Sequence, residues 1–272
     1  MRATPSTDPG LPPETVARLR APATAAVETG DVPGLVTLAW QGNRIIDVHA
    51  VGLADIAAAR PMEPGTIFRI ASMTKPVTTV CALTLVEEGL MRLEDPITKW
   101  APEFTDMRVL RTPDGPLDDT CPAPRAITIE DLMTHRSGLT AYNFVDPGPL
   151  AQASAVLGNG IDSPLSSDAW LAALAALPLA YAPGERFNYG FSIDLLGLII
   201  GRAVKTSFRQ AMAERVFGPL HMHDTDFWIA PDKRERAAVP YDAGAGLGDF
   251  TPGEPSAFIG EAPQDFASGG QG

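Results

Sequence analysis

The chain has 272 residues, of which 45% are hydrophobic and 20% charged, and its formal net charge is −12. This length and composition predict a globular protein with one large domain or two small ones. The negative charge argues against nucleic acid or an anionic membrane as the partner, because both attract basic surfaces.

The first elements predicted along the chain are a helix and a β-hairpin. Residues 14–29 follow two prolines and end at a glycine, which is typical of a helix, and Pro22 predicts a kink or a break in it. Residues 35–40 and 44–51 are β-type runs, and the Gln41-Gly42-Asn43 turn between them predicts a hairpin.

The N-terminal residues lack the apolar segment of a signal peptide, and no apolar run is long enough to cross a bilayer. These features predict a cytoplasmic protein with no membrane partner. The chain has two cysteines. Cys81 lies in an apolar run, so we expect a buried thiol rather than a disulfide framework.

The next segment places Ser72 and Lys75 three residues apart at the start of an apolar run. Pro76 is tolerated only in a first helical turn, so we expect the helix to begin near Ala71 or Ser72. Residues at i and i+3 share a helix face, and a lysine there can take the serine proton. The spacing alone is equally typical of a helix cap followed by an exposed lysine.

The apolar residues between 77 and 86 cover most of the circumference of this helix, which predicts a buried helix that ends near Gly89. Residues from about 90 to 220 read as a mostly helical insertion. Within it, Thr128 and Asp131 form a capping-box pattern that opens a short helix through His135. Because Lys75 already offers a base, we expect a structural role for His135, with a direct catalytic role as the alternative.

The segment 141–166 is rich in loop-forming residues, and loops of this length in compact domains are often functional. Tyr142 and Phe144 are candidates for lining a substrate pocket there, although such aromatic residues also pin loops. His221 and His223 resemble a metal pair, but no further His or Cys accompanies them, so we predict no metal site.

Five motifs occur together in an order found in one superfamily. They are Ile70-Ala-Ser-Met-Thr-Lys75, Leu85-Val-Glu-Glu-Gly89, Leu132-Met-Thr-His-Arg-Ser-Gly-Leu139, Pro183-Gly-Glu-x-Phe-x-Tyr189 and Phe217-Gly-Pro-Leu-His-Met222. The chain resembles the class C β-lactamase-like branch of the serine β-lactamase and penicillin-binding-protein superfamily. Within that branch it looks most like the family VIII carboxylesterases.

The resemblance implies an α/β fold in which helices flank an antiparallel sheet, with an additional mostly helical domain. We expect three segments: 1–90 with the nucleophile helix, 91–225 as the helical domain, and 226–272 as a return to the α/β domain. The chain ends in Ser268-Gly-Gly-Gln-Gly272, where family members continue with further strands, so it looks C-terminally truncated. The resemblance places a third motif and the second oxyanion donor in that continuation.

The resemblance also implies the roles of the site residues. Ser72 is the nucleophile that accepts the acyl group, and Lys75 and Tyr189 move its proton, with either of them as the base. Class C β-lactamases carry Asn at the position of Phe191, where it contacts the lactam side chain. An apolar residue there suits the acyl chain of an ester, so Phe191 is a candidate substrate-binding residue.

We therefore predict a serine hydrolase that cleaves carboxylic esters with short acyl chains through an acyl-enzyme and without a cofactor. One alternative is a β-lactamase or a D-amino-acid peptidase on the same scaffold. The other is an inactive fragment that keeps the motifs.

Overall fold

The computed structural model describes residues 11–113, 115–140, 148–158, 163–244, 246–253 and 260–271. The chain forms two compact units. The first unit comprises residues 1–69 and 229–259, and the second comprises residues 70–228 and 260–272. These units divide the chain differently from the three predicted segments. The helix that follows Ser72 belongs with the helical part, and the last residues return to it.

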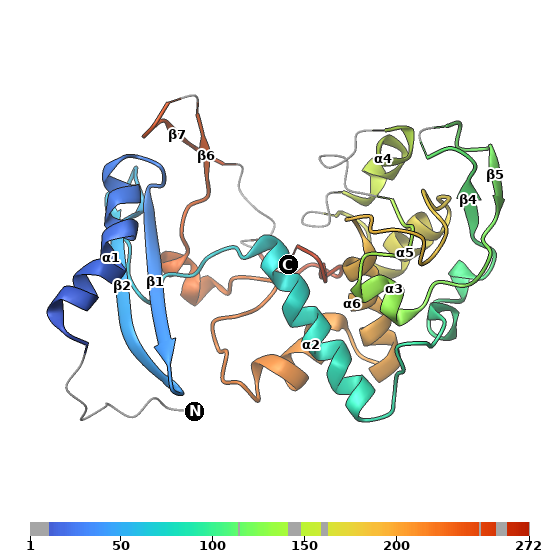
Figure 1. Cartoon of the computed structure of the whole chain (residues 1–272), viewed down its shortest axis with the longest axis horizontal. Coiled ribbons are helices and arrows are strands. Elements are labelled where there is room, and N and C mark those ends of the chain that lie inside the picture. Colours follow the sequence, from blue (N-terminus) through green and yellow to red (C-terminus); the bar gives the residue numbers. More distant parts are fainter. Residues whose placement is uncertain are drawn as a thin grey trace. The chain divides into compact units, whose positions relative to one another are not determined.

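The first unit contains the predicted helix and hairpin (Figure 1). Its main elements are α1 (Pro13–Glu28), β1 (Gly34–Gln41), β2 (Arg44–Asp55) and β3 (Arg60–Pro61), and the strands form an antiparallel sheet in the order β1-β2-β3. The hairpin turn has positive φ at Gly42 (57°) and Asn43 (61°), which glycine and asparagine tolerate best. Helix α1 runs through Pro22 without a break, and Arg20 ties it to the sheet through a 2.6 Å ion pair with Asp47.

The remainder of the first unit is a 3₁₀ turn at Pro231–Arg236 and a short antiparallel pair, β6 (Tyr241–Ala243) with β7 (Phe250–Pro252). The Tyr241 hydroxyl accepts a hydrogen bond from the main-chain N–H of Ile56 at 2.8 Å. This bond joins the C-terminal part of the unit to the end of β2.

The second unit is mostly helical, as predicted, with one short strand pair. Its elements are α2 (Thr74–Glu87), β4 (Arg108–Leu110), β5 (Thr120–Pro122), α3 (Ile129–Met133), α4 (Pro149–Ala153), α5 (Ser167–Ala175), α6 (Ser192–Val204) and α7 (Phe208–Met212). Helix α6 packs against α2, α3, α5 and α7, and its residues 192–201 are all buried (Figure 1). An apolar helix of this kind forms the centre of a core.

Helix α2 buries only one of its faces. Cys81, Ala82 and Leu85 are 0% exposed in the core shared with α6, which explains why α2 belongs to the second unit. On the opposite face Val80 is 49% and Leu83 42% exposed. The prediction of a fully buried helix was wrong. Apolar residues cover most of the circumference of α2, but the described elements pack against one face of it and leave the other exposed.

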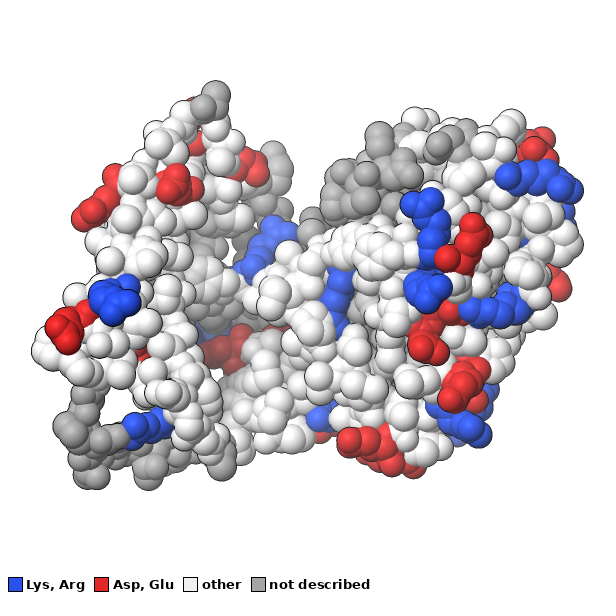
Figure 2. All heavy atoms as spheres, viewed as in Figure 1, with Lys and Arg blue, Asp and Glu red and all other residues white. Residues whose placement is uncertain are grey.

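On the face drawn in Figure 2, basic and acidic side chains of the second unit lie interspersed rather than gathered by sign. Within the described residues, none of the helices combines the length and apolar character needed to cross a membrane.

Candidate active site

Ser72 is mounted on a strained turn at the start of α2. Residues Ala71–Met73 form a 3₁₀ turn that continues directly into the α-helix, close to the predicted start. Ala71 has φ of 43°, a left-handed conformation that costs free energy for any residue with a Cβ. Strain of this kind is concentrated at functional sites, where the surrounding structure maintains it.

The structure brings together the three side chains that the sequence assigned to catalysis. Lys75 Nζ donates to Ser72 Oγ at 3.1 Å, and the Tyr189 hydroxyl donates to the same oxygen at 2.7 Å. Lys75 Nζ also lies 4.6 Å from the centroid of the Tyr189 ring. Tyr189 precedes α6 and Ser72 precedes α2, so the packing of these two helices brings the three groups together.

The chain segment 268–271 completes the surroundings of Ser72. The carbonyl oxygen of Gly270 accepts from Lys75 Nζ at 2.7 Å, and that of Gly269 accepts from the Thr78 hydroxyl at 2.8 Å. Gln271 Oε1 lies 3.5 Å from Ser72 Oγ. A Cβ at Gly269 would lie 2.3 Å from the carbonyl oxygen of Ile193, so only glycine fits this close approach.

His135 lies against Tyr189, which the sequence could not show. Their ring centroids are 4.8 Å apart, and His135 is 8% exposed. Burial, and to a smaller extent the positive charge of Lys75, lowers the pKa of the His135 imidazole to about 4, so it is neutral near pH 7. Among the described residues its Nδ1 atom has no hydrogen-bond partner.

Hydrogen bonds of the main chain and of side chains hold the segments that carry His135 and Tyr189. The N–H of Asn188 donates to the carbonyl of His135 at 2.7 Å, and its side-chain amide donates to the carbonyl of Leu139 at 2.6 Å. The Ser137 and Ser192 hydroxyls share a buried 2.8 Å bond. Tyr189, which follows Asn188, is therefore held by the loop 135–139.

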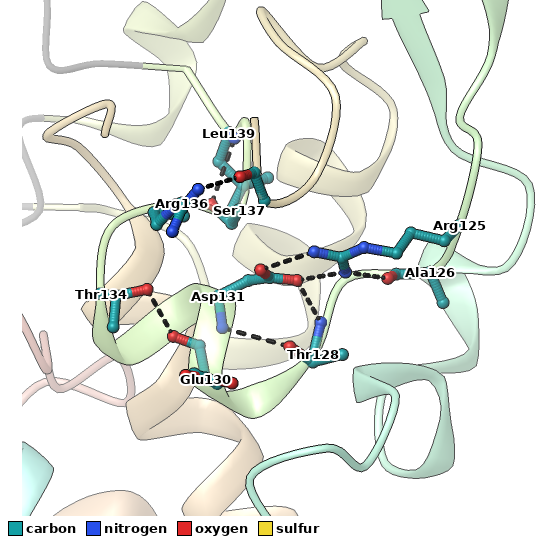
Figure 3. A network of polar contacts seen from close by, with 10 residues as sticks. Arg125, Ala126, Thr128, Glu130, Asp131, Thr134, Arg136, Ser137 and Leu139 are labelled. Carbon is teal, nitrogen blue, oxygen red and sulfur yellow. Dashed lines mark hydrogen bonds and ion pairs between the residues drawn. The ribbon is translucent and has the colours of Figure 1, made fainter. Parts of the chain in front are cut away.

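Helix α3 anchors the start of this loop, as Figure 3 shows. The predicted capping box is present, since the Thr128 side chain accepts from the N–H of Asp131 and Asp131 accepts from the N–H of Thr128. Arg125 Nη2 donates to Asp131 Oδ1 at 2.8 Å. Burial raises the pKa of the Asp131 carboxyl, but the hydrogen bonds from Arg125 and Thr128 outweigh it and hold that pKa below its ordinary value.

The residues predicted to contact substrate are placed differently from the three catalytic candidates. Phe191 is 1% exposed and packs edge-on against Trp170, with ring centroids 5.7 Å apart. Its aromatic side chain thus belongs to the hydrophobic core, and its role as a substrate-binding residue stays a prediction. Tyr142 and Phe144 lie outside the described residues.

Two further groups were singled out in the sequence, the pair His221 and His223 and the thiol of Cys81. The rings of His221 and His223 lie 5.7 Å apart, and the described residues contain no cluster of three or more His, Cys, Asp or Glu that could hold a metal. Cys81 is buried with a free thiol, and its burial raises the pKa of that thiol to about 11. A thiol in this state is not a nucleophile.

Sequence comparison relates the chain to proteins of one family. The family model described as Beta-lactamase matches residues 19–270. Protein Rv1367c of Mycobacterium tuberculosis is 48% identical over 214 residues, which are 79% of this chain and 52% of that protein. Esterase EstB of Burkholderia gladioli is 35% identical over 229 residues, which are 84% of this chain and 55% of the esterase.

A solved structure agrees with this relationship. The structure described as EstCE1, a hydrolase with promiscuous acyltransferase activity, aligns with a TM-score of 0.80 and 27% identity over 95% of this chain and 68% of that chain. The present chain spans about half the length of the curated relatives it matches. The predicted β-lactamase and penicillin-binding-protein fold is confirmed by these matches, and the chain belongs to the beta-lactamase family.

Proposed function

We propose that this chain carries the nucleophile of a serine hydrolase that cleaves carboxylic esters with short acyl chains. The observation that supports the proposal most is the convergence of Lys75 Nζ and the Tyr189 hydroxyl on Ser72 Oγ, at 3.1 and 2.7 Å. An activated nucleophile needs a proton acceptor within such reach. A helix cap followed by an exposed lysine would not place Lys75 at 8% exposure against two neighbouring groups.

In the proposed reaction, the base is the deprotonated form of one neighbour, the neutral amine of Lys75 or the phenolate of Tyr189, and it takes the Ser72 proton as Oγ attacks the ester carbonyl. The main-chain N–H of Ser72 stabilises the oxyanion, and the alcohol leaves with a proton delivered through Tyr189. Water then hydrolyses the acyl-enzyme and regenerates the serine. Both neighbours contact the same oxygen, so either can be the base.

The printed names of two relatives favour an ester over a lactam as substrate. EstB is named an esterase, and EstCE1 is described as a hydrolase with promiscuous acyltransferase activity. Acyl transfer needs the same acyl-enzyme and differs only in its last step, where an alcohol replaces water. We therefore propose alcoholysis as a second activity of the same site.

The distribution of surface charge also bears on the class of substrate. The interspersed charges on the face in Figure 2 and the net charge of −12 favour a small neutral ester over a nucleic acid.

The test is the hydrolysis of p-nitrophenyl butyrate by the parent chain and by Ser72→Ala. We expect Ser72→Ala to lose at least ~10³-fold in kcat/KM. Ser154→Ala is the control, because it also removes a serine hydroxyl, and among the described residues that hydroxyl bonds locally, to the carbonyl of Ala151 at 2.8 Å. Undiminished turnover by Ser72→Ala would refute the proposal, and rapid nitrocefin turnover without ester turnover would point to a β-lactamase instead.

A further inference from the structure

A buried carboxylate lies behind the proposed site and takes no part in the reaction derived above. Asp194, in the first turn of α6, is 0% exposed. Its Oδ1 accepts hydrogen bonds from the Ser268 hydroxyl and, at 3.2 Å, from the main-chain N–H of Gly270. Removing a carboxylate from water is costly, and such hydrogen bonds offset part of that cost.

The Ser268 hydroxyl in turn organises the chain segment that follows it. Its oxygen accepts from the main-chain N–H of Gln271 at 2.8 Å and of Gly270 at 3.2 Å. A serine that bonds the N–H groups two and three residues later closes a tight turn. The turn 268–271 is therefore built around one hydroxyl, and Asp194 fixes that hydroxyl.

This turn presents its carbonyl groups to the side chains of α2. Gly270 accepts from Lys75 Nζ at 2.7 Å, and Gly269 accepts from Thr78 at 2.8 Å. The bond from Lys75 to Gly270 is shorter than its 3.1 Å bond to Ser72. The position of the lysine nitrogen thus depends on where the turn holds the carbonyl of Gly270.

We propose that Asp194 and Ser268 are positioning residues, which hold the turn 268–271 so that the Gly270 carbonyl keeps the Lys75 side-chain nitrogen beside Ser72 Oγ. The inference rests on the proposed function, since it concerns the activation of the same serine. A lysine side chain has many rotamers, so it stays in one geometry only when it is held there. A displacement of about 1 Å in a reacting group can cost on the order of 10² in rate.

The test compares Ser268→Ala and Asp194→Asn with the parent chain. Ser268→Ala removes the hydroxyl that closes the turn, whereas Asp194→Asn keeps an acceptor oxygen for it. Ser154→Ala again serves as the control, because it removes an equally buried hydroxyl that has no bond to the turn. Each protein is assayed for kcat and KM with p-nitrophenyl butyrate, for the rate of phosphonylation by a fluorophosphonate, and for its thermal unfolding.

We expect Ser268→Ala to lose roughly 10- to 100-fold in kcat and in phosphonylation rate, with KM changed by less than about threefold. Asp194→Asn should lose less, and Ser154→Ala should match the parent. The loss of kcat in Ser268→Ala must persist well below the unfolding temperature of that variant. If Ser268 contributed only to stability, kcat would be unchanged at such temperatures.

Three results would overturn the inference. The first is an unchanged kcat in Ser268→Ala, and the second is a raised KM in that variant with kcat preserved. The third is a loss of kcat that is fully explained by a smaller folded fraction of the variant. In each case an active parent chain would leave the proposed function standing. A parent chain that neither hydrolyses the ester nor reacts with the fluorophosphonate would refute the proposed function, and the positioning role with it.

Discussion

Two polar clusters in the second unit differ in the groups that contact one another. In the cluster of Arg125, Thr128 and Asp131, a guanidinium faces a carboxylate and the capping box is closed on both sides (Figure 3). In the cluster of Ser72, Lys75 and Tyr189, the ammonium donates to the uncharged oxygens of Ser72 and Gly270. The neighbouring His135 buries a nitrogen that has no partner among the described residues.

The difference separates a cluster that stabilises from one that is prepared for chemistry. Opposite charges with satisfied hydrogen bonds stabilise a fold, whereas a buried nitrogen without a partner, as at His135, and a strained backbone cost stability and are found at functional sites. Ala71, with φ of 43°, adds such strain beside Ser72. Substitutions in the two clusters should therefore have opposite effects on activity and stability.

The largest effect is expected for Lys75→Met, which replaces the ammonium with an apolar group of similar length. We expect kcat to fall by roughly 10³-fold, because Ser72 loses a proton-transfer partner. The free energy of unfolding should rise by about 1 kcal/mol, because a nearly buried charge is removed. Activity assays and urea unfolding measure the two quantities. If Lys75→Met lost both activity and stability, the two clusters would not differ in the way proposed.

Tyr189→Phe should lower kcat by roughly 10²-fold, because the hydroxyl that donates to Ser72 is lost while the ring keeps its packing against His135. Tyr241→Phe is the matched control, since it removes a hydrogen-bonded tyrosine hydroxyl in the first unit. Equal kcat values for the two variants would show that the Tyr189 hydroxyl has no part in the reaction.

Asp131→Ala should act in the opposite sense, on stability. We expect the free energy of unfolding to fall by about 2 kcal/mol, because the N–H of Thr128 loses its side of the capping box and Arg125 loses its partner. Below the unfolding temperature kcat should stay within about threefold of the parent. The control is Lys99→Ala, which breaks an exposed ion pair with Asp95 and should cost less than about 0.5 kcal/mol. Similar losses in the two variants would mean that the cluster of Arg125, Thr128 and Asp131 is no more stabilising than a surface pair.

A smaller effect is expected in the pH dependence of stability. The folded pKa of His135 is about 4, against an ordinary value of 6.5, so between these values the unfolded chain binds a proton that the folded chain does not. Stability should therefore fall as the pH decreases from about 6.5 to about 4, by roughly 2–3 kcal/mol. The lowered carboxyl pKa values remove stability as the pH falls below the ordinary values of 3.8 for Asp47, Asp95 and Asp131 and 4.5 for Glu88, so only Glu88 adds to the lower end of this window.

His135→Asn should flatten the pH dependence, because asparagine does not titrate and tolerates the positive φ of 53° at this position. Urea unfolding of both proteins at several pH values between 4 and 7 measures the difference. The same slope in both would show that another group titrates in this window.

Local patterns predicted the local parts of the structure. Two β-type runs and a glycine-containing turn predicted the hairpin. Thr128 and Asp131 predicted the cap of α3, and the spacing of Ser72 and Lys75 predicted their contact. Tyr189 was a candidate only through the family resemblance, since 117 residues separate it from Ser72.

The missed features depend on tertiary packing. The Gly270 carbonyl reaches Lys75 across 195 residues of sequence, and Asp194 reaches Ser268 across 74. No local pattern reports such contacts. The same limit explains the error on the exposed face of α2, because composition predicts that a side chain is apolar but not which neighbours cover it.

The most direct test of the central claim, that Ser72 is an activated nucleophile, is intact mass spectrometry after brief exposure to a fluorophosphonate. We predict a single adduct that maps to Ser72, disappears in Ser72→Ala and forms more slowly in Tyr189→Phe. A cooperatively folded chain that acquires no adduct, or acquires it equally in Ser72→Ala, would contradict the claim.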